Sequence, residues 1–309
     1  MLRALNTGVT GIRQFQTNLD TIGNNLANVN TIGYKSGRVE FTDTLNQTLR
    51  AGTPDSAARS GTGSVQVGNG VEISSVRNLF TQGAVNQTGV ATDLAISGDG
   101  FFVVRSLTPA GTTSELFATR AGDFRVDQNG FLVTDQGFRV LGFNNPPTAA
   151  DYAATDTIND IKLDKGTLPA TLPASAAAAG ITNISIDSSG KINVLLSDGS
   201  QYVRGQILLQ RFTNPNALLK QGSNLYSGMS TAGAHAGTAI AAPFGTDPTL
   251  ARANSAGLGR IDSGALELSN VDIAREFSSM ITTQRAFQAN ARVVTTSDNI
   301  LQEIVQLVR

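Results

Sequence analysis

The stretch MLRALNTGVTGIRQFQTNLDTIGNNLANVN, at residues 1–30, repeats its apolar side chains every seven positions. The repeat has two rows, the second lying three positions after the first. Two rows with that spacing form the a/d seam of a helix packed in a coiled coil. The sequence therefore predicts an N-terminal coiled-coil helix, whose first row is Leu5, Ile12, Leu19 and Leu26 and whose second row is Gly8, Phe15, Ile22 and Val29.

The C-terminal segment, residues 270–309, carries a matching repeat. Its first row recurs every seven residues without a slip, and a companion row is apolar at its ends and mixed in its middle. Ser269 and Asp272 have the S-x-x-[DE] spacing of a capping box, which predicts the start of this helix. The two predicted rows are Ile273, Met280, Phe287, Val294, Leu301 and Val308, and Phe277, Gln284, Ala291, Asp298 and Val305.

The remaining faces of the N-terminal helix carry few charges, namely Arg3, Arg13 and Asp20. An isolated coiled coil places charges beside its seam to face water, so these faces are suited to being covered by neighbouring molecules. Three glycines each weaken the helix by about 1 kcal/mol. We expect the two helices to become ordered on assembly, with a single-chain helical hairpin as the alternative. The predicted self-assembly residues are Leu5, Ile12, Phe15, Leu19, Ile22, Leu26, Val29, Ile273, Phe277, Met280, Phe287, Val294, Leu301 and Val308.

Between the helices the apolar period changes from 3.5 to 2, and the segments 93–104, 124–133 and 184–203 each contain Asn-Gly, Asp-Gly or Ser-Gly steps. Such steps mark tight turns between antiparallel strands. The predicted fold is therefore α+β: an antiparallel β-rich body, a barrel or sandwich, with the N- and C-terminal helices forming a coiled-coil stalk. The predicted domains are 1–30 plus 270–309 (helices), 31–75 (linker), 76–145 plus 181–268 (body) and 146–180 (low-complexity insertion).

Composition argues against several classes of function. The net charge of −1 gives no electrostatic basis for binding nucleic acid or an anionic membrane. The chain has no cysteine and one histidine, His235, which disfavours catalytic triads and the usual zinc sites. The N-terminus has no unbroken apolar core of a signal peptide, so we expect no cleaved signal and no membrane insertion.

Two short motifs have a chemical interpretation that their context disfavours. Residues 188–191 match S-x-x-K, a serine-nucleophile motif that requires the start of a helix, whereas here the motif falls in a predicted β-turn. Residues 127–130 faintly resemble a calcium loop, but Arg125 occupies a position that needs an oxygen ligand. We therefore expect no enzymatic activity, no cofactor and no metal.

Three segments resemble the signatures of one protein family. LDTIGNNLANVNTIGYK at 19–35, DLAISGDGFF at 93–102 and GALELSNVDIA at 264–274 are similar to the N-terminal, body and C-terminal motifs of bacterial flagellar hook and rod proteins. The resemblance implies a structural subunit of the flagellar axial tube, located in the hook or basal body. Its implied partners are other copies of itself in a helical homopolymer, adjacent rod, hook or hook-junction proteins, a hook or rod cap, and the flagellar export apparatus.

The type of family member is less sharply indicated. GALELSNVD at 264–272, FTDTLNQ at 41–47 and VLGF at 140–143 favour a hook-type subunit that transmits torque. The long Gly/Ser/Thr-rich segment 50–70, and a body without an obvious second outer domain, favour the distal rod protein as the alternative. A secreted coiled-coil/β adhesin is the second alternative. The sequence thus predicts an axial subunit, with the hook type preferred.

Overall fold

The computed structural model describes residues 2–54, 60–107, 115–146, 152, 158–164, 169, 179–233, 251–255 and 257–307. The chain forms two compact units. The first unit comprises Met1–Val29, Ser36–Leu79 and Val271–Arg309, and the second comprises Asn30–Lys35 and Phe80–Asn270. The chain therefore passes between the units four times.

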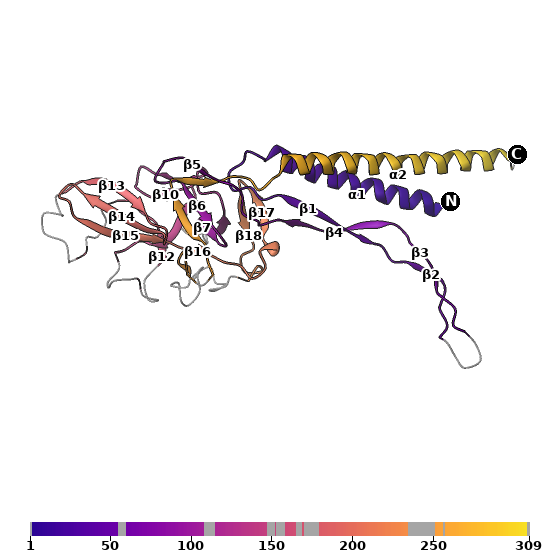
Figure 1. Cartoon of the computed structure of the whole chain (residues 1–309), viewed down its shortest axis with the longest axis horizontal. Coiled ribbons are helices and arrows are strands. Elements are labelled where there is room, and N and C mark those ends of the chain that lie inside the picture. The colour runs from indigo at the N-terminus through magenta and orange to yellow at the C-terminus, as the bar shows by residue number, and fades with distance from the viewer. Residues whose placement is uncertain are drawn as a thin grey trace. The chain divides into compact units, whose positions relative to one another are not determined.

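Two helices form the core of the first unit. Helix α1 spans Leu2–Ala27 and helix α2 spans Ile273–Leu307. They pack side by side and run antiparallel, with both chain termini at the same end of the pair (Figure 1). The two terminal helices predicted from the heptad repeats are confirmed.

The start of α2 differs from the predicted capping box. The Asp272 carboxylate accepts a hydrogen bond from the backbone N–H of Arg275 at 3.2 Å, so Asp272 itself is the N-cap. An N-cap side chain must lie two or three residues before the N–H that it satisfies. Ser269 lies too early for that role and is buried in the segment before the helix.

A long β-hairpin completes the first unit. Strand β1 (Gly37–Asp43) pairs antiparallel with β4 (Val71–Asn78), and further along β2 (Gln47–Arg50) pairs with β3 (Val65–Val67). The predicted linker, residues 31–75, covers most of these residues, and its composition did not indicate the paired strands that the structure shows there. Short strands of alternating polar and β-branched residues pair well locally but leave no long apolar pattern.

The second unit is built from antiparallel sheets. Every strand pairing that the structure describes is antiparallel, and the largest sheet has the order β13-β14-β15-β11-β7-β8-β18-β17, with β9, β10, β12 and β16 attached at its side. Two-stranded sheets, β19-β6 and β20-β5, accompany it. The predicted α+β class, an antiparallel β-rich body with helices at both ends, is confirmed.

The strands of the second unit are β5 (Val85–Gln87), β6 (Leu94–Ser97), β7 (Phe101–Arg105), β8 (Leu116–Thr119), β9 (Arg125–Val126), β10 (Leu132–Val133), β11 (Arg139–Phe143), β12 (Ile158–Asp160), β13 (Ile181–Ile186), β14 (Lys191–Leu196), β15 (Gln201–Ile207), β16 (Leu209–Gln210), β17 (Leu219–Gly222), β18 (Leu225–Ser227), β19 (Arg260–Ser263) and β20 (Ala265–Glu267), with a short 3-10 helix, η2 (Pro215–Ala217). Strand β7 lies at the centre and is buried on both faces. Phe102 and Val104 pack into one apolar cluster, and Val103 packs into another with Phe143.

The predicted tight turns are present at glycines with positive φ. Gly130 (φ 84°) and Gly190 (φ 78°) each close a turn in which the glycine N–H donates to the carbonyl three residues earlier, at 2.8 Å. The segment 93–104 differs from a simple hairpin, because β6 pairs with β19 while β7 pairs with β8 and β11. Most of the predicted insertion 146–180, and His235, lie outside the described residues.

Candidate self-assembly surface

The predicted seam residues of α1 lie where the helix meets its neighbours within the first unit. Ile22 is 5% exposed, and the other members of the set are half-buried: Leu5, Ile12, Phe15, Leu19, Leu26 and Val29. Phe15 also contacts Phe41 of β1, with ring centroids 5.7 Å apart. Helix α1 therefore packs against α2 and also against the hairpin.

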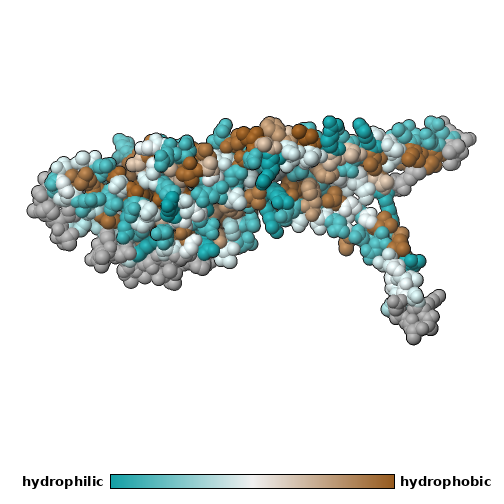
Figure 2. All heavy atoms as spheres, in the orientation of Figure 1, coloured by the Kyte–Doolittle hydropathy of each residue, from teal (hydrophilic) through white to brown (hydrophobic). Residues whose placement is uncertain are grey.

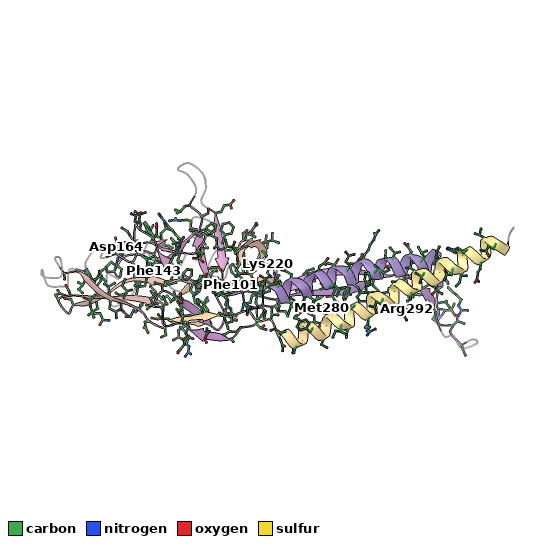
Figure 3. All side chains as sticks on the ribbon, turned by 90° about the horizontal axis from the view of Figure 1, so that it is seen from above. Phe101, Phe143, Asp164, Lys220, Met280 and Arg292 are labelled. Carbon is green, nitrogen blue, oxygen red and sulfur yellow. The ribbon has the colours of Figure 1, made fainter. Side chains whose placement is uncertain are left out.

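The predicted seam residues of α2 divide into two groups. Met280 (labelled in Figure 3), Phe287, Val294 and Leu301 are half-buried and belong to the row that faces α1. Ile273 and Phe277 are each 47% exposed, and Val308 lies outside the described residues. Much of the predicted self-assembly row is therefore engaged in pairing within one chain.

The second contact row of α2 is polar, which the apolar pattern did not indicate. Thr283 and Ser297 are 6% and 8% exposed, with Asn290 between them. The Asn18 side chain donates to the Thr283 hydroxyl at 3.0 Å. Rows of Leu and Ile carry the usual signal for a seam, so a Thr-Asn-Ser row was missed although its spacing of seven is visible in the sequence.

Two glycines of α1 allow the helices to approach closely. A Cβ atom on Gly8 would lie 3.0 Å from Cγ2 of Val294, and one on Gly11 would lie 2.8 Å from Nδ2 of Asn290. Both distances are shorter than normal carbon contacts. These glycines, read in the sequence only as weakening the helix, are therefore fitted to larger side chains on α2.

Helix α2 also exposes apolar side chains that pairing with α1 leaves uncovered. Each successive residue turns the helix by about 100°. Counted from Met280, Phe277 and Ile281 in the N-terminal half therefore lie about 60° and 100° to one side of the row that faces α1. Counted from Val294 and Leu301, Val293 and Ile300 in the C-terminal half lie about 100° to the other side. We name these the first flank (Phe277 and Ile281) and the second flank (Val293 and Ile300); Ile273 and Ile304 are also exposed.

The hairpin adds further exposed apolar side chains. Leu45 is 90% exposed, Leu49 is 58% exposed and Val65 is 43% exposed. An isolated two-stranded hairpin is marginally stable in water, and each strand of this ribbon leaves one edge unpaired in the described part of the chain. On the face seen in Figure 2, hydrophobic atoms mix with polar ones along both the helices and this hairpin. An unpaired strand edge that carries exposed apolar side chains favours contact with other protein.

Among the described residues, few side chains are arranged as a catalytic or metal-binding site would require. No three His, Asp or Glu side chains gather closely enough there to hold a metal ion. Ser188 and Lys191 lie across the β13–β14 turn, where the Asp187 carboxylate accepts a hydrogen bond from the Ser188 backbone N–H at 2.6 Å. An open groove of about 410 Å³ is lined by Val85, Ile186 and neighbouring residues of β19. Of the helices described, none is both long and apolar enough to cross a membrane.

Comparison with known proteins gives matches along the whole chain. The family models match as Flagella basal body rod protein (residues 5–35), Flagellar hook protein FlgE/F/G D1 domain (95–194) and Flagellar basal body rod FlgEFG protein C-terminal (262–307). The Flagellar basal-body rod protein FlgG of Bacillus subtilis is 40% identical and covers 100% of both chains. The FlgG protein of Borreliella burgdorferi is 39% identical over 97% of each.

A hook protein also matches, more distantly. The Flagellar hook protein FlgE of Borreliella burgdorferi is 26% identical and covers 99% of this chain and 100% of its own, in an alignment of 460 positions. The rod protein of Bacillus subtilis aligns over 309 positions, the length of this chain. This chain belongs to the family of flagellar basal-body rod and hook proteins, which is a family of structural proteins and not of enzymes.

Proposed function

We propose that this chain is a subunit of the flagellar rod, of the distal rod type, which polymerises into a helical tube and transmits torque. The observation that carries the proposal is the full-length match to basal-body rod proteins at 40% and 39% identity. The hook type, which the sequence motifs favoured, has weaker support because the hook relative is 26% identical and requires a much longer alignment.

The hairpin is consistent with a rod. A drive shaft needs neighbouring subunits that are locked together, whereas a bending joint needs subunits that slide. Residues 37–54 and 60–78 contain the paired strands of a ribbon that exposes Leu45, Leu49 and Val65. Burying these side chains on neighbouring copies would stabilise the contact by about 1.5–3 kcal/mol for each fully buried side chain. Such contacts oppose sliding between subunits.

The flanks of α2 provide the contact between copies in this proposal. The first flank and the second flank differ in sequence and lie on opposite sides of the helix. A contact between the first flank of one copy and the second flank of the next is heterologous, so it repeats from copy to copy and builds an open filament unless it closes into a ring. Phe277 and Ile300 lie about 35 Å apart along α2, at 1.5 Å per residue. Neighbouring copies would therefore be staggered along the tube, as in a helical assembly.

Cysteine crosslinking tests this contact without interference, because the chain has no cysteine of its own. We expect the double variant Phe277→Cys/Ile300→Cys to form disulfide ladders in assembled material, and each single variant to remain monomeric on non-reducing gels. A Phe277→Cys/Leu219→Cys double variant is the control, since Leu219 is exposed on β17 and belongs to neither flank. Dimers of either single variant, or no ladder from Phe277→Cys/Ile300→Cys in assembled material, would contradict the heterologous contact.

The partners follow from the same proposal. The subunit would contact other copies of itself and the adjacent axial proteins of the rod and hook. Export through the flagellar export apparatus without a cleaved signal, and assembly under a cap, belong to the proposal and are supported by the resemblance alone. Membership of this family is evidence against the secreted-adhesin alternative.

A further inference from the structure

Three segments of the second unit adjoin the points where the chain passes between the units, and they meet at one buried ion cluster. The segments are 30–35, 80–83 and 267–270. Lys35 Nζ lies 2.6 Å from Oε1 of Glu267, and Arg120 Nη1 lies 3.3 Å from Oε2 of the same carboxylate. The side chains of Lys35 and Glu267 are 0% exposed, and that of Arg120 is 3% exposed.

Hydrogen bonds extend this cluster to the backbone of each segment. Lys35 Nζ donates to the carbonyl of Thr81 at 2.7 Å, and the backbone N–H of Gly83 donates to Oε1 of Glu267 at 2.9 Å. The backbone N–H of Gly33 donates to the carbonyl of Glu267 at 2.8 Å. Each of the three segments is thus bonded to another through Lys35 or Glu267.

Arg120 connects the cluster to the interior of the second unit. Its Nη2 donates to the carbonyl of Gly98 at 2.9 Å, and its guanidinium lies over the ring of Phe101, 5.1 Å from the ring centroid. Phe101 belongs to an apolar cluster that also contains Phe212 and Tyr226. The segments are therefore attached to packed side chains of the body.

Close backbone packing reinforces these bonds. Gly33 has a φ of 67°, and a Cβ atom there would lie 2.6 Å from the backbone nitrogen of Ala121. A Cβ atom on Gly83 would lie 2.0 Å from the carbonyl oxygen of Leu268. Only glycine fits at these two positions, so segment 30–35 lies directly on the body backbone at Ala121, and segment 80–83 lies directly on segment 267–270.

Burying these three charged side chains has a high desolvation cost. Burial lowers the pKa of Lys35 and that of Arg120 below their usual values, and the Glu267 carboxylate opposes both shifts. Well-packed apolar side chains of similar volume are often at least as stabilising as a buried ion pair. Ion pairs and charge-assisted hydrogen bonds differ from apolar packing in being directional, so they fix the geometry of the groups they join.

We propose that Lys35, Arg120 and Glu267 form a mechanical anchor that holds the crossing segments on the body, so that torque carried by the terminal helices passes to the body without peeling these segments away. This inference rests on the proposed function only for the source of the torque. The anchor itself is a property of a single chain, and it makes residues 30–35 part of the body although they follow directly after α1.

The test is amide hydrogen exchange on the soluble, unassembled full chain carrying Lys35→Met. This substitution keeps an unbranched side chain but leaves the Thr81 carbonyl and one Glu267 oxygen without their cation. We expect exchange at Gly33 and Gly83 to accelerate at least tenfold. Exchange at Leu132, whose N–H donates to the Ile161 carbonyl inside the body, should stay within twofold of the parent.

The matched control is Lys162→Met, which removes a partly exposed lysine from its ion pair with Asp164, at 2.6 Å, and which lies outside the crossing segments. Unchanged exchange at Gly33 in Lys35→Met, or an equal acceleration at Leu132, would overturn the anchor. If Lys35→Met does not fold, Arg120→Lys provides the same comparison, because a lysine cannot reproduce the fork that joins Glu267 to Gly98.

The same variants separate the anchor from the proposed function. Exchange is measured on monomers, so a negative result there contradicts the anchor even if the parent chain forms tubes. In assembled material we expect Lys35→Met tubes to form and to have a persistence length at least twofold shorter than that of the parent. Failure of the parent itself to form tubes would contradict the proposed function and leave the exchange result standing.

Discussion

Replacing Phe287 with Asp places a charge in the contact row between α1 and α2. Phe287 is half-buried and lies on the same row as Val294, which contacts the position of Gly8. Half-burial of a phenylalanine side chain stabilises the helix pair by about 1 kcal/mol, which the substitution removes. Placing a carboxylate in the same partly buried contact destabilises the pair by a further 1–3 kcal/mol, roughly. The expected destabilisation of the helix pair is therefore about 2–4 kcal/mol.

That cost acts on a helix with a low intrinsic propensity. In an isolated helix, Gly8, Gly11 and Gly23 together cost about 3 kcal/mol relative to alanine, although Gly8 and Gly11 permit the close packing of α1 on α2. The helix pair and the body belong to two different compact units, and the apolar clusters described for the body are made of residues outside α1 and α2. We expect Phe287→Asp to abolish assembly while the thermal transition of the body shifts by less than about 2 °C.

The assay combines calorimetry of the soluble chain with electron microscopy of assembled material. Thr296→Asp is the matched control, because Thr296 is exposed, carries the same new charge on the same helix, and lies nine residues, or about 180°, from Phe287. It should leave the thermal transition of the body near that of the parent. Because Thr296 lies one turn from Ile300 of the second flank, we expect Thr296→Asp to weaken assembly less than Phe287→Asp does. A drop of several degrees in the body transition of Phe287→Asp would refute the reasoning, since it would show that the helices stabilise the body.

Three further outcomes are expected. Deleting residues 51–64 should leave the thermal transition of the body unchanged and lower the persistence length of assembled tubes by electron microscopy; unchanged stiffness would mean that the hairpin is passive. Limited proteolysis of the unassembled chain should trim α1 and α2 faster than the body, and equal resistance would contradict ordering on assembly. Burial raises the pKa of Tyr226, so the folded chain keeps this proton above about pH 10, where an unfolded tyrosine loses it. Its stabilising effect is therefore full below about pH 10 and is lost as the pH rises further. Tyr226→Phe should reduce the fall in melting temperature between pH 9 and about pH 11, and an undiminished fall would contradict the assignment.

The heptad repeats made the helices predictable, because a period of 3.5 over four or more heptads leaves few alternatives to a packed helix. The strands of the body were predictable where a Gly step closed a turn, as at Gly130 and Gly190. These signals are local. They do not say which strands pair, and so the separation of β6 from β7 into different sheets was not foreseen.

The assembly surface was predicted only in part. The apolar rows identified the side chains that become buried in a helix contact. The sequence did not distinguish burial against another chain from burial within the same chain. The structure places Val294 against Gly8 within one chain and leaves Phe277 exposed. A polar row containing Thr283 and Ser297 gave no hydrophobic signal at all, although both residues are buried.

The buried ion cluster had no sequence signal. Lys35 and Glu267 lie 232 positions apart, and each stands in a motif where a charged residue is unremarkable on its own. Only the folded backbone brings them together with Arg120. The hairpin of residues 37–78 was missed for a different reason: its Gly, Ser and Thr content is that of a loop, and its pairing depends on short strands with weak individual preferences.

The measurement that tests the central claim most directly is electron microscopy of the purified chain at concentrations that drive assembly. A rod subunit with two complementary flanks on α2 and a contact-forming hairpin is expected to form long, straight tubes with a helical repeat. Supercoiled, bendable tubes would contradict the rod type in favour of the hook type. A chain that remains monomeric, or that closes into rings without growing further, would contradict the account of an axial subunit.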